Sequence, residues 1–79
     1  MKKQPPRKYY IDEAALIAIG GKIREIRTQK NISQEMLANE CDIDYSQINR
    51  MELGKVNFSI SNFLKVAAKL GVDAKDLLP

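Results

Sequence analysis

The chain has 79 residues, enough for one domain whose modest core needs close helix packing, a covalent staple or a partner. Its single cysteine, Cys41, excludes an intramolecular disulfide, and without any histidine the chain cannot build a zinc site. No apolar run reaches the roughly 18 residues of a membrane span. The basic start, "MKKQPPRKYY", is not followed by the apolar stretch of a signal peptide. We therefore expect a cytoplasmic protein that needs no cofactor.

The net charge of +3 is distributed unevenly along the chain. Residues 1–11 carry four basic and no acidic side chains, whereas residues 12–79 carry 9 basic and 10 acidic ones, which sum to −1. We expect residues 1–11 to form a flexible basic tail and residues 12–79 to form the folded domain. Such a tail can lie along an anionic surface such as nucleic acid. The alternative is a solvated terminus without a partner.

The first predicted helix begins after Asp12, a favourable N-cap residue, and runs to about Lys30. Its apolar residues recur at helical spacing, at Leu16, Ile19, Ile23 and Ile26. Gly20-Gly21 interrupts this pattern at a cost of about 1 kcal/mol per glycine relative to Ala. Because the period continues through both glycines, we keep one helix and expect them to admit another helix at close range. Asn31 is suited to the left-handed backbone conformation that often ends a helix.

Ser33 is the predicted N-cap of a second helix, which ends near Cys41-Asp42. Its apolar contacts are expected from Met36, Leu37 and Cys41. Cys41 is interpreted as a small core residue rather than a reactive thiol. A third helix can be capped by Asp44, since Gln47 stands at capping-box spacing from it, and this helix stops at Gly54.

The fourth predicted helix begins after Ser59 and ends at Gly71. Its apolar positions are Ile60, Phe63, Leu64, Val66, Ala67 and Leu70. Asp73 can cap a short fifth helix, "AKDLL", which Pro79 ends. No segment shows strand alternation with hairpin turns. The sequence therefore predicts an all-α, compact five-helix domain.

The central segment "SQEMLANECDIDYSQINRMELG" has the form of a helix-turn-helix, whose second helix can enter a DNA major groove. Two helices joined by so short a turn must pack closely and obliquely. The small Ala38 and the apolar Ile43 and Ile48 suit that packing.

The chain resembles the XRE family of helix-turn-helix proteins, typified by phage repressors and Cro, from about Ile19 to Leu78. The likeness rests on "IGGKIREIRTQKNISQEMLA", "INRMELGKVNFSISNFLKVAAKLGV" and "DAKDLL". It implies a phage-repressor-like fold and a transcription regulator that binds double-stranded DNA. Such a regulator would bind a pseudo-palindromic operator as a homodimer, with residues 44–52 as the recognition helix, and would block or contact RNA polymerase.

The resemblance also assigns roles to individual residues. It places Gln34 and the amino end of its helix at a DNA phosphate, where unpaired amides and the helix dipole suit an anion. Lys55 and the segment 57–61 would contact the DNA backbone. The positions that would reach base edges are Tyr45, Ser46, Gln47 and Arg50, with Asn49 on their flank. Gln can pair with adenine and Arg with guanine. For Gln47 the competing role is the capping box, and for Tyr45 it is packing against the second helix.

Arg27 and Glu52 match a family ion pair that would fix the recognition helix to the first helix. Two residues depart from the family pattern: Asp42 stands where Gly is usual in the turn, and Asp44 caps where Ser or Thr is commoner. Between Asp42 and Asn57 there are two basic and three acidic residues, so the electrostatic attraction of this surface for DNA is weak.

Two other functions remain open. An antitoxin would keep DNA binding and add a surface for a toxin partner, and a pure protein-interaction module would have lost DNA binding. An enzyme is not expected, because the chain has no His and Cys41 has no base partner. Expected dimer contacts are Leu77 and Leu78 with outward residues of the fourth helix, or else residues 9–11.

Overall fold

The computed structural model describes residues 10–79, and most of the predicted tail, residues 1–9, lies outside this range. Four α-helices follow in order: α1 (Glu13–Gln29), α2 (Gln34–Cys41), α3 (Tyr45–Glu52) and α4 (Ile60–Leu70). A single 3₁₀ turn, η1 (Ala74–Leu77), ends the domain. The all-α class is therefore confirmed, with four α-helices among the described residues. Among the described residues, none of the helices combines the length and the hydropathy that a membrane span requires.

The helices begin where short polar side chains can cap them. Asp12 accepts from the backbone N–H of Ala15 at 2.9 Å, and Ser33 and Ser59 each accept from the residue three positions on. Asn31 adopts the predicted left-handed conformation, with φ 57°. These local signals explain why the predicted boundaries of the first four helices agree with the structure.

The predicted fifth α-helix is wrong, because residues 74–77 form a 3₁₀ turn. Pro79 disfavours α-helical backbone in the preceding residue, and Leu78 is accordingly extended, with ψ 150°. Four residues remain, which is enough for i→i+3 bonds but too short for a stable α-helix.

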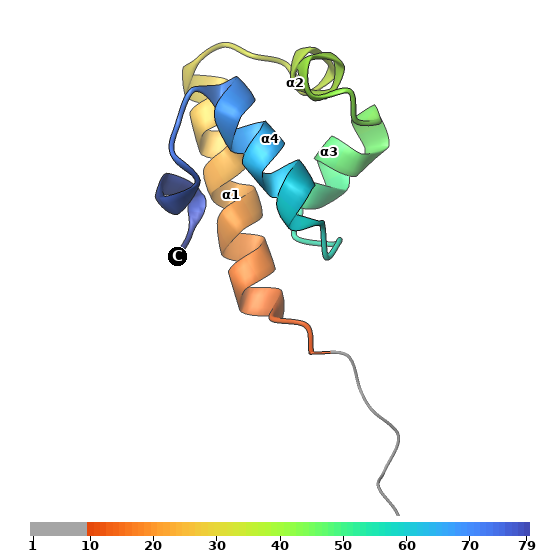
Figure 1. Ribbon diagram of the computed structural model, residues 1–79, viewed down its shortest axis with the longest axis vertical. Coiled ribbons are helices and arrows are strands. Elements are labelled where there is room, and N and C mark those ends of the chain that lie inside the picture. Colours follow the sequence, from red (N-terminus) through yellow and green to blue (C-terminus); the bar gives the residue numbers. More distant parts are fainter. Residues whose placement is uncertain (1–9) are drawn as a thin grey trace, which may run out of the picture.

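The core lies among the four α-helices and η1 (Figure 1). Pairwise, α1 packs on α3, α2 packs on α3 and α4, and η1 packs on α4 and α1. The buried apolar residues are Ile19, Ile23, Leu37, Ala38, Cys41, Ile48, Met51, Phe63, Val66, Ala67, Leu70 and Leu77. Cys41 is fully buried, which raises the pKa of its thiol and keeps it an unreactive core residue, as predicted.

Three apolar residues expected among the packing positions are exposed instead. Met36 on α2 and Ile60 and Leu64 on α4 keep half or more of their surface in solvent. On α4 the residues facing the core are spaced three and four apart, at Phe63, Val66, Ala67 and Leu70, so Leu64 lies one position off that stripe. Conversely, Leu77, predicted to contact a dimer partner, is 1% exposed and belongs to the core.

Gly20 allows a very close approach of two helices. A Cβ atom at this position would meet backbone atoms at the end of α3, including the carbonyl oxygens of Met51 and Glu52. The prediction of close helix approach is therefore confirmed for Gly20. At Gly21 a Cβ would meet nothing within 4 Å. The missing side chain of Gly20 thus lets α3 lie directly against α1, whereas Gly21 does not take part in this contact.

Candidate nucleic-acid interface

The turn between α2 and α3 positions the candidate recognition helix. Asp42 takes the left-handed conformation, with φ 53° and ψ 45°, so it adopts the backbone that the family usually assigns to Gly. The backbone N–H groups of Asp42 and Ile43 bond back to carbonyl oxygens of α2. The chain is therefore reversed without a glycine, and α3 begins three residues later.

The predicted capping box at the start of α3 is wrong. Asp44 occupies the N-cap position, but its exposed carboxylate makes no hydrogen bond to the helix. Its backbone carbonyl oxygen instead accepts from the N–H groups of Gln47 and Ile48. The turn is satisfied by backbone bonds, so the carboxylate stays in water and Gln47 is not engaged by it.

The two sides of α3 differ sharply. Ile48, Met51 and Glu52 are buried, whereas Tyr45, Ser46 and Arg50 are exposed. Gln47 and Asn49 are half-buried at the margins of the exposed side. The residues predicted to reach base edges are thus brought together on the solvent side of one helix, and about half of the Tyr45 surface is open rather than packed on α2.

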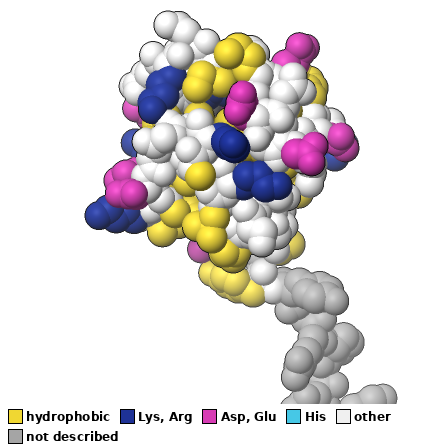
Figure 2. Space-filling view, turned by 45° about the horizontal axis from the view of Figure 1, so that its top comes forward, with side chains coloured by type: hydrophobic (Ala, Val, Ile, Leu, Met, Phe, Trp, Pro, Cys, Tyr) yellow, Lys and Arg dark blue, Asp and Glu magenta, His cyan; other side chains and the backbone are white. Residues whose placement is uncertain are grey.

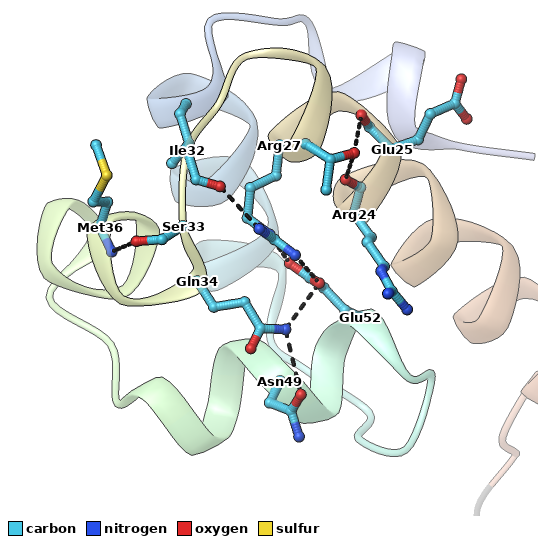
Figure 3. A network of polar contacts seen from close by, with 10 residues as sticks. Arg24, Glu25, Arg27, Ile32, Ser33, Gln34, Met36, Asn49 and Glu52 are labelled. Atoms are coloured by element: carbon cyan, nitrogen blue, oxygen red, sulfur yellow. Dashed lines mark hydrogen bonds and ion pairs between the residues drawn. The ribbon is translucent and has the colours of Figure 1, made fainter.

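Glu52 anchors α3 to α1 through a two-pronged ion pair. Arg27 Nε lies 2.6 Å from Glu52 Oε2 and Arg27 Nη2 lies 2.9 Å from Glu52 Oε1 (Figure 3). Arg27 Nη1 also donates to the carbonyl oxygen of Ile32 at 2.8 Å, which ties in the segment before α2. The hydrogen bond to Glu52 raises the pKa of Arg27, although partial burial opposes that rise. The ion pair expected from the family resemblance is present.

Gln34 is drawn into the same network. Its amide nitrogen donates to Glu52 Oε1 at 2.9 Å and to Asn49 Oδ1 at 3.3 Å. A glutamine amide has two N–H donors, and both are used inside the protein. The resemblance implies that Gln34 binds a DNA phosphate, which accepts hydrogen bonds. The amino end of α2 also offers other donors to a phosphate, namely its first backbone N–H groups and the hydroxyl of the exposed Ser33.

The remaining predicted backbone contacts lie beyond α3. Lys55 is exposed in the segment that follows the helix. Ser59 and Ile60 begin α4, where Ser59 Oγ accepts from the backbone N–H of Asn62 at 3.1 Å. Lys55, Ser59 and Ile60 are all exposed, so their contact with DNA stays a prediction.

Arg24 was missed by the sequence-based prediction. Its side chain extends from α1 beside Glu52, toward α3, and lines one shallow hollow with Gln34, Tyr45 and Asn49 (Figure 3). The available signal was its position three residues before Arg27, which places both arginines on neighbouring parts of one helix face. Arg24 adds positive charge beside α3 that the count over residues 42–57 did not include.

Even so, the surface is not strongly basic. On the face of the molecule presented in Figure 2, basic, acidic and apolar side chains are interspersed. Of the three acidic residues counted near α3, Glu52 is paired with Arg27 in the interior. Among residues 42–57 the exposed charges are thus Arg50 and Lys55 against Asp42 and Asp44, and α1 adds the positive charge of Arg24.

Comparisons with known proteins agree with this geometry. A family model described as "Helix-turn-helix" matches residues 23–77. The chain is 46% identical over 63 residues to control protein C.BamHI of Bacillus amyloliquefaciens, in a match that covers 78% of each chain. It is 36% identical over 62 residues to control protein C.MunI of Mycoplasma sp, covering 77% of this chain and 84% of that protein.

Among solved structures, the restriction-modification controller protein C.AhdI from Aeromonas hydrophila superposes with a TM-score of 0.76 at 39% sequence identity. That match covers 78% of this chain and 94% of the other. The family match spans well over half of the chain and includes α2, α3 and both partners of the Arg27–Glu52 ion pair. The chain therefore belongs to the XRE-type helix-turn-helix family of DNA-binding transcription regulators.

Proposed function

We propose that this regulator controls a restriction–modification system and binds a pseudo-palindromic operator as a homodimer. The observation that carries the proposal is the division of α3. Its inner side is locked to α1 by the Arg27–Glu52 pair, while Tyr45, Ser46 and Arg50 are exposed. A helix anchored on one side, with hydrogen-bonding groups on its exposed side, suits the major groove.

Within this proposal the residues divide into two sets. Tyr45, Ser46, Gln47 and Arg50 read base edges, which specify the sequence. Arg24, Lys55 and the amino ends of α2 and α4 contact phosphates, which set the register. The protein then blocks or contacts RNA polymerase at the promoter.

The controller role is favoured over an antitoxin role by the names of the relatives. C.BamHI and C.MunI are called control proteins, and C.AhdI is called a restriction-modification controller. The genomic neighbourhood tests this part of the proposal. Genes for a restriction endonuclease and a DNA methyltransferase beside this one are expected, whereas an adjacent toxin gene would support the antitoxin instead.

The DNA-binding part is tested by selecting sites from random double-stranded DNA. Two half-sites with centres about one helical turn apart, roughly 10 base pairs, are expected. A salt titration on selected and random DNA accompanies the selection. If neither DNA binds at any salt concentration, the protein is an interaction module and the proposal fails.

Arg50→Ala is expected to weaken operator binding by about 1–3 kcal/mol, since a two-pronged contact to guanine contributes that much discrimination. The loss should be concentrated at one base pair of each half-site, with discrimination there reduced. Affinity for each single-base operator variant is the measurement. Lys69→Ala is the control, because Lys69 is an exposed cation in the last turn of α4. An equal loss on every sequence would make Arg50 a phosphate contact.

Leu64→Asp is expected to convert the dimer into a monomer and to weaken operator binding. Ile60 and Leu64 stand one turn apart on α4, 71% and 50% exposed, and Leu78 follows η1, which packs on α4. We propose this apolar surface as the contact between protomers, because burying it in a dimer removes it from water. Sedimentation velocity measures the change, with the neighbouring exposed Lys65→Asp as control. A Leu64→Asp protein that remains a dimer would rule out this surface.

A further inference from the structure

Four polar side chains form one continuous chain from the interior of the domain to the edge of the candidate interface. Arg27 on α1 holds both carboxylate oxygens of Glu52, at 2.6 and 2.9 Å. Glu52 Oε1 accepts from the amide of Gln34 at 2.9 Å, and that same amide nitrogen donates to Asn49 Oδ1 at 3.3 Å. The chain links α1, α2 and α3 and ends at a side chain beside the exposed recognition residues (Figure 3).

The ion pair dictates the direction in which every amide of the chain points. If the Gln34 amide were reversed, its carbonyl oxygen would face the Glu52 carboxylate, and two acceptors would be opposed. If the Asn49 amide were reversed, its NH₂ group would face the NH₂ group of Gln34 at the same short separation. Unpaired polar groups that are shielded from water are costly. Arg27 therefore holds the Glu52 carboxylate in place. Glu52 sets the orientation of the Gln34 amide, and Gln34 sets the orientation of the Asn49 amide.

As a consequence, Asn49 presents one kind of group outward. Its oxygen lies on the inner side, against Gln34, and its nitrogen points away from the network (Figure 3). An asparagine pairs with adenine by offering its oxygen and its nitrogen together along one edge. That edge is not available here, because the oxygen is turned inward. The two N–H donors of Asn49 remain.

We propose that Asn49 contacts the operator as a hydrogen-bond donor only, with Gln34 as the residue that positions it. This inference rests on the proposed operator binding, and it adds which partner donates the hydrogen bond in one contact. Its counterpart is an acceptor atom of the DNA, either on a base edge (guanine O6 or N7, adenine N7, thymine O4) or on a phosphate oxygen. Arg24 lines the same hollow and attracts an electron-rich counterpart, while the exposed Glu35, which also lines it, acts in the opposite sense.

The test measures affinity of the full chain for its selected operator, for Asn49→Ala and for operators with single atoms removed. Asn49→Ala should bind about tenfold more weakly, the value of one hydrogen bond to a charged or strongly polar group. Thermal melting checks that the variant is folded. If wild-type protein has no specific site, the proposed function itself has failed, and that result is distinct from any difference between variants.

Chemically altered DNA then identifies the counterpart. Operators carry either a methylphosphonate at one linkage or a base without one major-groove acceptor. The proposal is supported if one such change removes the difference between wild type and Asn49→Ala. It is overturned if that difference vanishes instead when the 6-amino group of an adenine or the 4-amino group of a cytosine is removed, because Asn49 would then be accepting. Equal affinity of Asn49→Ala and wild type overturns it as well.

The positioning role of Gln34 is tested by Gln34→Met, which keeps the length of the side chain and removes the amide. In this background Asn49 can turn, so Asn49→Ala should cost about threefold or less rather than tenfold. The matched control is Asn39→Ala, which removes an exposed asparagine of α2 outside the chain. Its effect should be the same in the wild-type and the Gln34→Met backgrounds. If Asn49→Ala costs tenfold in both backgrounds, Gln34 does not position Asn49.

Discussion

Glu52→Ala is expected to unfold the protein rather than to weaken DNA binding alone. Glu52 is 7% exposed and accepts hydrogen bonds from Arg27 and Gln34. Removing one partner of a buried ion pair costs about 3–5 kcal/mol, because the other charge is left uncompensated. A domain of this size has a total stability near the lower end of about 5–15 kcal/mol. Chemical denaturation followed by circular dichroism is the measurement.

The double variant Arg27→Met, Glu52→Leu distinguishes the effect of the lost charges on stability from the effect of lost packing. It removes both charges and keeps apolar volume, so it should recover much of the stability lost in Glu52→Ala. The recovered protein should still bind its operator less well, since Gln34 and Asn49 lose the carboxylate that orients them. A Glu52→Ala protein that keeps its melting temperature but loses DNA affinity would contradict the structural role of the pair.

Gly20→Ala and Gly21→Ala should shift stability in opposite directions although both add a methyl group to the same helix. A Cβ at position 20 would lie 2.6 Å from the carbonyl oxygen of Glu52 and closer still to that of Met51. Both atoms belong to the backbone of α3, which cannot turn aside as a side chain can. We expect a loss of about 3 kcal/mol, at the upper end for overpacking.

Gly21→Ala is the matched control, because its Cβ would meet open space. Alanine is favoured over glycine in a helix by about 1 kcal/mol, which corresponds to a rise of roughly 4–8 °C in melting temperature for a domain of this size. Thermal melts of both variants decide the matter. A Gly20→Ala protein as stable as wild type would mean that α3 is not pressed against α1 at that residue.

The sequence predicted the α-helices well because their signals are local. Asp12, Ser33 and Ser59 each cap a helix from within the first turn, and Asn31 and Asp42 belong to the few residue types that tolerate left-handed backbone. The prediction was wrong where other groups could make the hydrogen bonds that a local signal suggested. The Asp44–Gln47 spacing permits a capping box, but the turn is already satisfied by backbone bonds.

Burial and amide orientation could not be predicted from spacing alone. Leu77 and Leu78 are adjacent leucines, and only the path of η1 places the first in the core and the second in solvent. Gln34 and Asn49 can each donate or accept, so their polarity depends on a carboxylate contributed by another part of the chain. The predicted roles on DNA stay predictions, since accessibility permits contact without specifying it; they concern Gln34, Tyr45, Ser46, Gln47, Asn49, Arg50 and Lys55.

The scarcity of exposed positive charge around α3 bears on how the regulator is shared among DNA sites in a cell. Affinity for random DNA comes almost entirely from counterions released by Lys and Arg, and the exposed cations beside this helix are few. For the proposed operator binding, this means that the described domain by itself holds little of the protein on the large excess of non-operator DNA, and that further sequence-neutral attraction has to come from the four basic residues of positions 1–11.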